Sequence, residues 1–168
     1  MRKVLTIFLG MFIFISCQKE SGVSKFTQDP DPIIRDALEN KKILILIVES
    51  ENCQYCDKLH KEVLDQPDFQ QKKIKNGINI AIIDANGERM VTDPETGAKM
   101  EESALAVAYK VTGYPTIIVF DPEQNYKVLY YQPGFIPKQD FMDFLDYLGS
   151  KCYQKIKFDQ FVENNKKC

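Results

Sequence analysis

The sequence Cys53-Gln54-Tyr55-Cys56 places two cysteines three residues apart, between an uncharged run at 43–48 and a segment at 57–64 that we expect to be helical. Residues with this spacing lie about one turn apart on the same face of a helix. At the helix start, Cys53 meets unpaired backbone N–H groups and the positive end of the helix dipole, which lower the pKa of a thiol. A thiolate attacks disulfides, so we predict Cys53 as the nucleophile and Cys56 as the resolving thiol.

The order of patterns along the chain predicts an α/β fold with a central mixed sheet flanked by helices. Helices are expected at 33–40, 57–64, 68–75, 101–110 and 138–148, strands at 43–48, 78–84, 116–120 and 126–131, and a loop or small hairpin between 86 and 100. Two crossovers are expected to give parallel strand pairs, and the short last connection an antiparallel pair. The expected core contains Ile45, Ile47, Ile80, Ile82, Ile117 and Val119. Residues 151–168 are expected to form a short helical extension.

The first residues are typical of an export signal. Arg2 and Lys3 precede the uncharged stretch Val4 to Ile15, which is too short to span a bilayer comfortably and fits a signal peptide. The alternative is a short membrane anchor that is not cleaved. The sequence Phe14-Ile15-Ser16-Cys17 resembles the lipobox of bacterial lipoproteins, and this resemblance implies that Cys17 is lipidated.

These patterns predict four regions: a signal peptide at 1–16, a lipidated Cys17 with a polar tether at 17–29, a folded domain at 30–150 and a tail at 151–168. The predicted location is therefore periplasmic, with the protein held on a membrane by its lipid. The formal net charge of -2 gives no indication of nucleic-acid binding.

Four further cysteines remain after Cys17, and an even number in an exported protein permits two disulfides. Cys152 and Cys168 either form a bridge that holds the tail or remain free. A zinc site is not expected, because the chain has no second Cys-x-x-Cys and His60 is its one histidine.

The Cys-x-x-Cys motif after a buried strand, together with Gly113-Tyr114-Pro115-Thr116 at the start of another, resembles the thioredoxin superfamily between Pro32 and Leu148. The resemblance implies a thioredoxin fold and a cis Tyr114–Pro115 bond facing the disulfide. It also implies that the Tyr114 backbone binds an extended substrate peptide. Gln54 and Tyr55, between the cysteines, are expected to influence the reduction potential.

Residues 53–60 resemble the active-site helix of bacterial periplasmic disulfide isomerases, whereas the whole chain is more similar to periplasmic thioredoxins found with sulfur-oxidation genes. Cytoplasmic thioredoxins carry an acid six residues before the first cysteine, where this chain has Ile47. Glu49 is the nearest acid, and it is either a proton shuttle or a plain strand-end carboxylate. His60 either tunes the thiolate or relays a proton, or it is simply packed or solvated. The dimerisation domain of the isomerases is not expected, so we expect a monomer.

The sequence therefore predicts a protein thiol–disulfide oxidoreductase whose only redox group is the Cys53–Cys56 pair, without a bound cofactor or metal. We expect it to reduce disulfides in exported proteins and to receive electrons from a membrane protein. One alternative is a disulfide oxidase or isomerase. Others are a chaperone that binds Cu(I) through the two cysteines, with His60 as a poorly placed third ligand, and a redox-inert binding domain.

Overall fold

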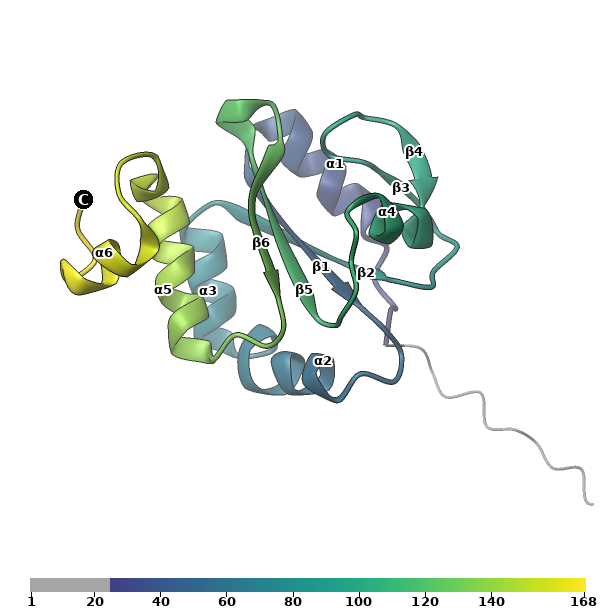
Figure 1. The fold of residues 1–168 in the computed structure, drawn as a ribbon, viewed down its shortest axis with the longest axis horizontal. Helices are drawn as coiled ribbons and strands as arrows, with labels where there is room; N and C mark the ends of the chain where they lie inside the picture. Colours follow the sequence, from purple (N-terminus) through teal and green to yellow (C-terminus); the bar gives the residue numbers. More distant parts are fainter. Residues whose placement is uncertain (1–24) are drawn as a thin grey trace, which may run out of the picture.

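The computed structural model describes residues 25–168, which form a sheet covered by helices on both faces (Figure 1). The helices are α1 (Asp31–Asn40), α2 (Gln54–Leu59), α3 (Pro67–Lys75), α4 (Glu102–Ala108), α5 (Lys138–Gly149) and α6 (Phe158–Glu163), with short turns η1 (His60–Leu64), η2 (Pro122–Gln124) and η3 (Cys152–Gln154). The strands are β1 (Ile43–Glu49), β2 (Ile78–Asp84), β3 (Met90–Thr92), β4 (Lys99–Glu101), β5 (Thr116–Asp121) and β6 (Lys127–Pro133). The predicted α/β fold class with a mixed central sheet is confirmed.

The main sheet has the strand order β2-β1-β5-β6. β1 is parallel to β2 and antiparallel to β5, and β5 is antiparallel to β6. The expectation of a second parallel pair was wrong, because the chain after α4 enters β5 at the end of the sheet where β1 finishes, on the side of β1 away from β2. In this register Thr116 lies opposite Val48, so the start of β5 is beside the end of β1. Both segments that carry the predicted active-site residues therefore meet at one end of the sheet.

β1 forms the centre of the fold, and all seven of its residues are buried, as the uncharged run at 43–48 predicts for all but Glu49. Because side chains alternate along a strand, Ile45 and Ile47 pack on the face covered by α3 and α5, and Leu44 and Leu46 pack on the face of α1 and α4. Figure 1 shows these two helix pairs on opposite sides of the sheet.

β2 is an edge strand, and this position corrects the predicted core. Ile80 and Ile82 were expected inside, but they are only half-buried, whereas Ile45, Ile47, Ile117 and Val119 are buried. A strand at the edge of a sheet has a neighbour on one side only, so its side chains are covered less completely. The two isoleucines instead line a pocket described below.

The C-terminal tail is held by a disulfide between Cys152 and Cys168, whose Cα atoms are 5.6 Å apart. Phe158 and Phe161 of the tail stack against Tyr147 of α5, with ring centroids 5.4 Å and 5.2 Å away. Figure 1 shows α6 outside α5, on the side away from the sheet. The tail therefore extends the α3–α5 layer.

Arg89, just before β3, joins the N-terminal segment to the domain. Its guanidinium forms two hydrogen bonds with the buried carboxylate of Glu102, at 2.9 Å and 2.6 Å. The same group donates to the backbone carbonyls of Phe26 and Gln28, at 3.1 Å and 2.7 Å. Residues 25–28, which were expected to belong to a tether, are thus hydrogen-bonded to the folded body.

The expected signal peptide, Cys17 and residues 18–24 of the expected tether lie outside the described residues. Within residues 25–168, no helix combines the length and apolar character needed to cross a membrane.

Candidate active site

Cys53 and Cys56 form a disulfide at the start of α2, with Cα atoms 5.2 Å apart. Cys53 is the N-cap of the helix, and its Sγ accepts a hydrogen bond of 3.1 Å from the Cys56 backbone N–H. Cys53 is half-buried and Cys56 fully buried. Cys53 is therefore more accessible than Cys56, which is the asymmetry that a nucleophile and a resolving thiol require.

The active-site helix begins at Gln54, three residues earlier than expected, and its hydrogen-bond pattern changes from α-helical to π-helical at His60. Residues 60–64 form a π-helical turn in which the Asp65 N–H donates to the His60 carbonyl at 3.0 Å. Single π turns within helices are frequent at functional sites. No feature of hydrophobic spacing distinguishes such a turn from an ordinary helix, so the sequence did not indicate it.

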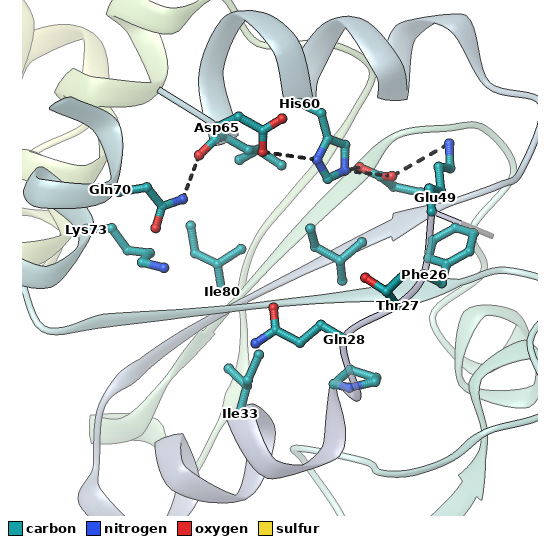
Figure 2. A pocket seen from close by; sticks show the side chains of 14 residues that line it. Phe26, Thr27, Gln28, Ile33, Glu49, His60, Asp65, Gln70, Lys73 and Ile80 are labelled. Atoms are coloured by element: carbon teal, nitrogen blue, oxygen red, sulfur yellow. Dashed lines mark hydrogen bonds and ion pairs between the residues drawn. The ribbon is translucent and has the colours of Figure 1, made fainter. Parts of the chain in front are cut away.

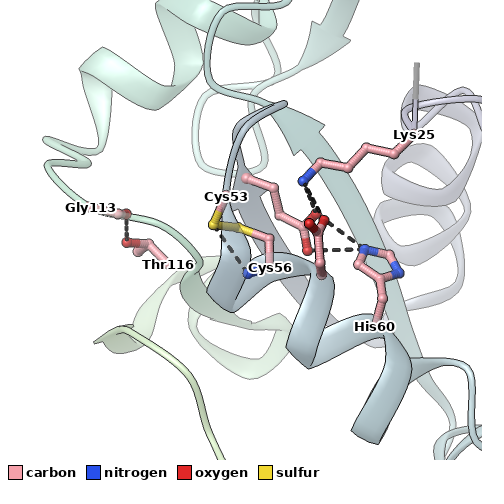
Figure 3. Close-up of a disulfide and its surroundings, with 8 residues drawn as sticks. Lys25, Cys53, Cys56, His60, Gly113 and Thr116 are labelled. Carbon is pink, nitrogen blue, oxygen red and sulfur yellow. Dashed lines mark hydrogen bonds and ion pairs between the residues drawn. A yellow bond between two sulfur atoms is a disulfide. The ribbon is translucent and has the colours of Figure 1, made fainter. Parts of the chain in front are cut away.

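The Tyr114–Pro115 peptide bond is cis, and Thr116 Oγ1 donates a 2.7 Å hydrogen bond to the Gly113 carbonyl. Figure 3 shows Gly113 and Thr116 on the Cys53 side of the disulfide, with Lys25 and His60 on the other side. The Tyr114 side chain is 36% exposed. The structure thus brings the loop before β5 beside the disulfide.

Glu49 ends β1 as a buried carboxylate, with 0% of its surface exposed. His60 Nε2 lies 3.1 Å from each of its two oxygens, and the hydrogen-bond geometry is satisfied at Oε2. Lys25 Nζ lies 3.8 Å from Oε2 of Glu49 and 3.3 Å from Asp57 Oδ1. Within the described part of the chain, Oε1 of Glu49 has no hydrogen-bond partner.

The hydrogen bond to Glu49 raises the pKa of His60 above its ordinary value of 6.5, although burial opposes this change. Asp65, whose Oδ1 lies 3.7 Å from His60 Nδ1, contributes in the same direction. A protonated His60 is therefore favoured between the two carboxylates. The prediction left the role of His60 open, and the structure places it in contact with Glu49.

A pocket of about 280 Å³ adjoins this pair, and we call it the side pocket. Figure 2 shows His60 and Asp65 along one side of it, with Glu49 near one end and Gln70 and Lys73 near the other. Burial lowers the pKa of the Lys73 ammonium. The Glu49–His60 pair thus borders a pocket that has both polar and apolar walls.

The remaining predicted site residues lie at the surface. Gln54 and Tyr55 are exposed, Tyr55 by 62%, on the first turn of α2. Lys25 and Asp65 contact the site but were not predicted, because Lys25 lies in a polar segment without periodicity and Asp65 follows the helix end. Among residues 25–168, no three His, Cys, Asp or Glu side chains are grouped so that they could hold a metal ion.

A mixed four-stranded sheet with a Cys-x-x-Cys disulfide at the start of a helix defines a protein of the thioredoxin fold. Residues 31–149 match the family described as thioredoxin-like domain, so the chain belongs to this family. With its Cys53–Cys56 disulfide, it is a thiol–disulfide oxidoreductase.

Solved structures show the same fold. A thioredoxin-fold protein from Helicobacter pylori is 24% identical, with a TM-score of 0.61 over 75% of this chain and 80% of that chain. A thioredoxin from Thermus thermophilus is 21% identical, with a TM-score of 0.55 over 72% of this chain and 86% of that chain. None of the curated proteins compared with this chain matches it.

Proposed function

We propose that this chain is an extracytoplasmic, lipid-tethered reductase of disulfides in exported proteins. The observation that carries the proposal is the Cys53–Cys56 disulfide at the start of α2, in which the first cysteine is half-buried and the second is fully buried. After reduction, the Cys56 N–H that now donates to Cys53 Sγ is positioned to stabilise a Cys53 thiolate.

The reaction proceeds by two thiol–disulfide exchanges. The Cys53 thiolate attacks one sulfur of a substrate disulfide, the substrate S–S bond breaks, and a mixed disulfide forms while the other substrate sulfur leaves as a thiolate that takes a proton from water. Cys56 then loses its proton and attacks Cys53 Sγ, which releases the second substrate sulfur as a thiolate and restores the Cys53–Cys56 bond. Glu49, buried at the end of β1, is the proposed acceptor of the Cys56 proton.

Substrate binding is proposed on the exposed surface around the disulfide. The Tyr114–Pro115 backbone lies at the start of β5, where an extended peptide can be added as in strand addition. Tyr55 and Tyr114 supply exposed aromatic surface. Both aromatic groups would pack against side chains next to the substrate cysteine.

The reducing direction is proposed on the resemblance of the chain to thioredoxins, whose active-site disulfides have low reduction potentials. Each turnover leaves the Cys53–Cys56 disulfide, so a membrane protein is the proposed donor that reduces it again.

The proposed location rests on the sequence at 1–17, with cleavage before Cys17 and lipid attached to this residue. Labelling of cells with a radioactive fatty acid tests this step. The proposal requires label on the wild-type protein and none on a Cys17→Ser variant. Label on neither protein contradicts the lipid anchor while leaving the redox chemistry standing.

The reductase activity is tested by insulin reduction with dithiothreitol as electron donor. We expect catalysis by the purified full-length protein and none by Cys53→Ser. A titration against glutathione should then give a potential near that of thioredoxin, about −270 mV. A potential above about −200 mV would indicate an oxidase or isomerase instead. Absence of activity together with stoichiometric Cu(I) uptake would support the chaperone alternative.

A further inference from the structure

His60 lies one helical turn beyond Cys56 on the same face of the continuous segment formed by α2 and η1. Figure 3 shows both side chains projecting from this segment near Lys25. The carboxylate that His60 and Lys25 share belongs to Glu49, whose position continues the alternation of Ile45 and Ile47 on this face of β1. Glu49 therefore lies beside His60, which is one helical turn from Cys56 along the same helical segment.

Both oxygens of Glu49 lie 3.1 Å from His60 Nε2, but they differ in their hydrogen bonds. Oε2 meets the hydrogen-bond criteria with His60, whereas the buried Oε1 has no hydrogen-bond partner among residues 25–168. A buried acceptor without a donor is unfavourable, so such atoms in native proteins require an explanation. A role for Oε1 as the atom that receives a proton during the reaction provides such an explanation.

The charged groups around the Glu49–His60 pair come from every neighbouring element. They are Lys25 before α1, Asp57 on α2, Asp65 after η1, Lys73 on α3 and Asp84, which lies opposite Glu49 in the register of β2. Asp65 is 69% exposed at its side chain and faces the imidazole edge that Glu49 does not occupy. The imidazole thus connects a buried carboxylate to a solvated one.

We propose that His60 is a positioning residue for the resolving step: it holds Glu49 as the acceptor of the Cys56 proton and releases a proton of its own toward Asp65 and the side pocket. This inference rests on the proposed function, in which Cys56 resolves the mixed disulfide. His60 does not touch the reacting sulfur atoms in this scheme. It acts through Glu49.

The proton balance of the step is simple. In the resting state the imidazolium donates its Nε2–H to Glu49, and its Nδ1–H faces Asp65. When Cys56 attacks Cys53, the thiol proton moves to Glu49. The carboxylate then loses the negative charge that stabilised the imidazolium. The imidazolium then loses its Nδ1 proton to water in the side pocket, whose volume of about 280 Å³ holds several water molecules. One proton leaves Cys56 and one reaches solvent.

The two exchange steps can be followed separately with 5,5′-dithiobis(2-nitrobenzoate). Full-length protein reduced to two thiols releases one coloured thiolate when Cys53 attacks the reagent and a second when Cys56 resolves the adduct. We expect His60→Gln to leave the first phase unchanged and to slow the second about tenfold at pH 7. This is less than the roughly 10²–10⁴-fold effect of losing a direct acid or base, because His60 acts through Glu49. The ionisation of His60 should also disappear from the pH profile of the second phase.

The matched control is Glu62→Gln, a change on the same turn at an exposed residue that pairs with Lys58 at 3.9 Å. It should leave both phases unchanged. Adding His60→Gln to Glu49→Gln should cause no further slowing, because the two residues act as one unit. Equal second phases in wild type and His60→Gln, or additive losses in the double variant, would overturn the inference.

A second readout does not depend on turnover. His60 is the one histidine of the chain, so its imidazole proton resonances are unambiguous in an NMR titration. Glu49→Gln should lower the pKa of His60, and an unchanged value would contradict the coupling. A wild-type protein that releases only the first thiolate would instead refute the resolving role of Cys56, which is a failure of the proposed function and is distinct from these outcomes.

Discussion

His60 Nε2 lies 3.1 Å from both carboxylate oxygens of Glu49, a side chain with none of its surface exposed. In this region of reduced dielectric, the carboxylate stabilises the charged form of the imidazole and raises the pKa of His60. The pair therefore links the stability of the fold to pH as well as contributing to the proposed chemistry.

The first prediction concerns this link. The pKa of His60 is raised in the folded state, chiefly by its hydrogen bond to Glu49, above the ordinary value of 6.5. Its contribution to stability is therefore fully present below about pH 6.5 and is lost as pH rises through the raised folded-state value. His60→Gln should reduce the free energy of unfolding by about 1 kcal/mol at pH 6 and by much less at pH 9. Urea unfolding at both pH values measures the difference, and an equal loss at both would contradict it.

The second prediction concerns the disulfide of the tail. Cys152 and Cys168 are 16 residues apart, and closing a loop of this length stabilises a protein by about 3 kcal/mol in the chain-entropy model. Cys168→Ser should therefore lower the free energy of unfolding by about 2–3 kcal/mol. Insulin reduction should be unaffected, because the bridge and α2 lie in different parts of the molecule (Figure 1). Denaturant unfolding checks the stability, and a variant as stable as wild type would show that the bridge contributes little.

The third prediction concerns Arg89, which pairs with the carboxylate of Glu102, itself only 1% exposed. Arg89→Ala leaves this carboxylate buried without its cation and should reduce stability by about 3 kcal/mol. Arg89→Lys retains a positive charge without the paired geometry and should lose less. Thermal unfolding of the three proteins gives the order. Equal stability of wild type and Arg89→Ala would show that Glu102 is adequately solvated by other groups.

The fourth prediction concerns the reactivity of Cys53. In a Cys56→Ser variant, the backbone N–H groups at the start of α2 remain and should stabilise the Cys53 thiolate. The rate of alkylation by iodoacetamide should reach half its maximum between about pH 3.5 and 7.5, below the value near 8.5 of a free cysteine. A midpoint at or above that of free cysteine would remove the physical basis of the proposed nucleophile.

Sequence patterns predicted the parts of the fold that depend on local spacing. The uncharged run of β1 predicted a strand buried on both faces, and the apolar spacing of α5 predicted an amphipathic helix, because burial imposes a periodicity on both. The direction of β5 was predicted wrongly. Strand direction depends on where a crossover rejoins the sheet, and local residues do not determine that point.

The sequence likewise predicted only part of the active site. Cys53 and Cys56 could be proposed from spacing alone, whereas the contact between Glu49 and His60 joins residues eleven positions apart on different elements. The half-burial of Ile80 and Ile82 likewise follows from the edge position of β2, which only the assembled sheet defines. Long-range arrangement, and not composition, decides these features.

The bonds from Arg89 to the Phe26 and Gln28 carbonyls have a practical consequence for handling the protein. They fix the chain at Lys25, whose ammonium touches Glu49 and Asp57 beside the reactive cysteines. An affinity tag or biosensor linkage placed just ahead of Lys25 will thus disturb the charges beside the Cys53–Cys56 disulfide. Immobilisation through α6, which lies outside α5 in Figure 1, avoids this interference.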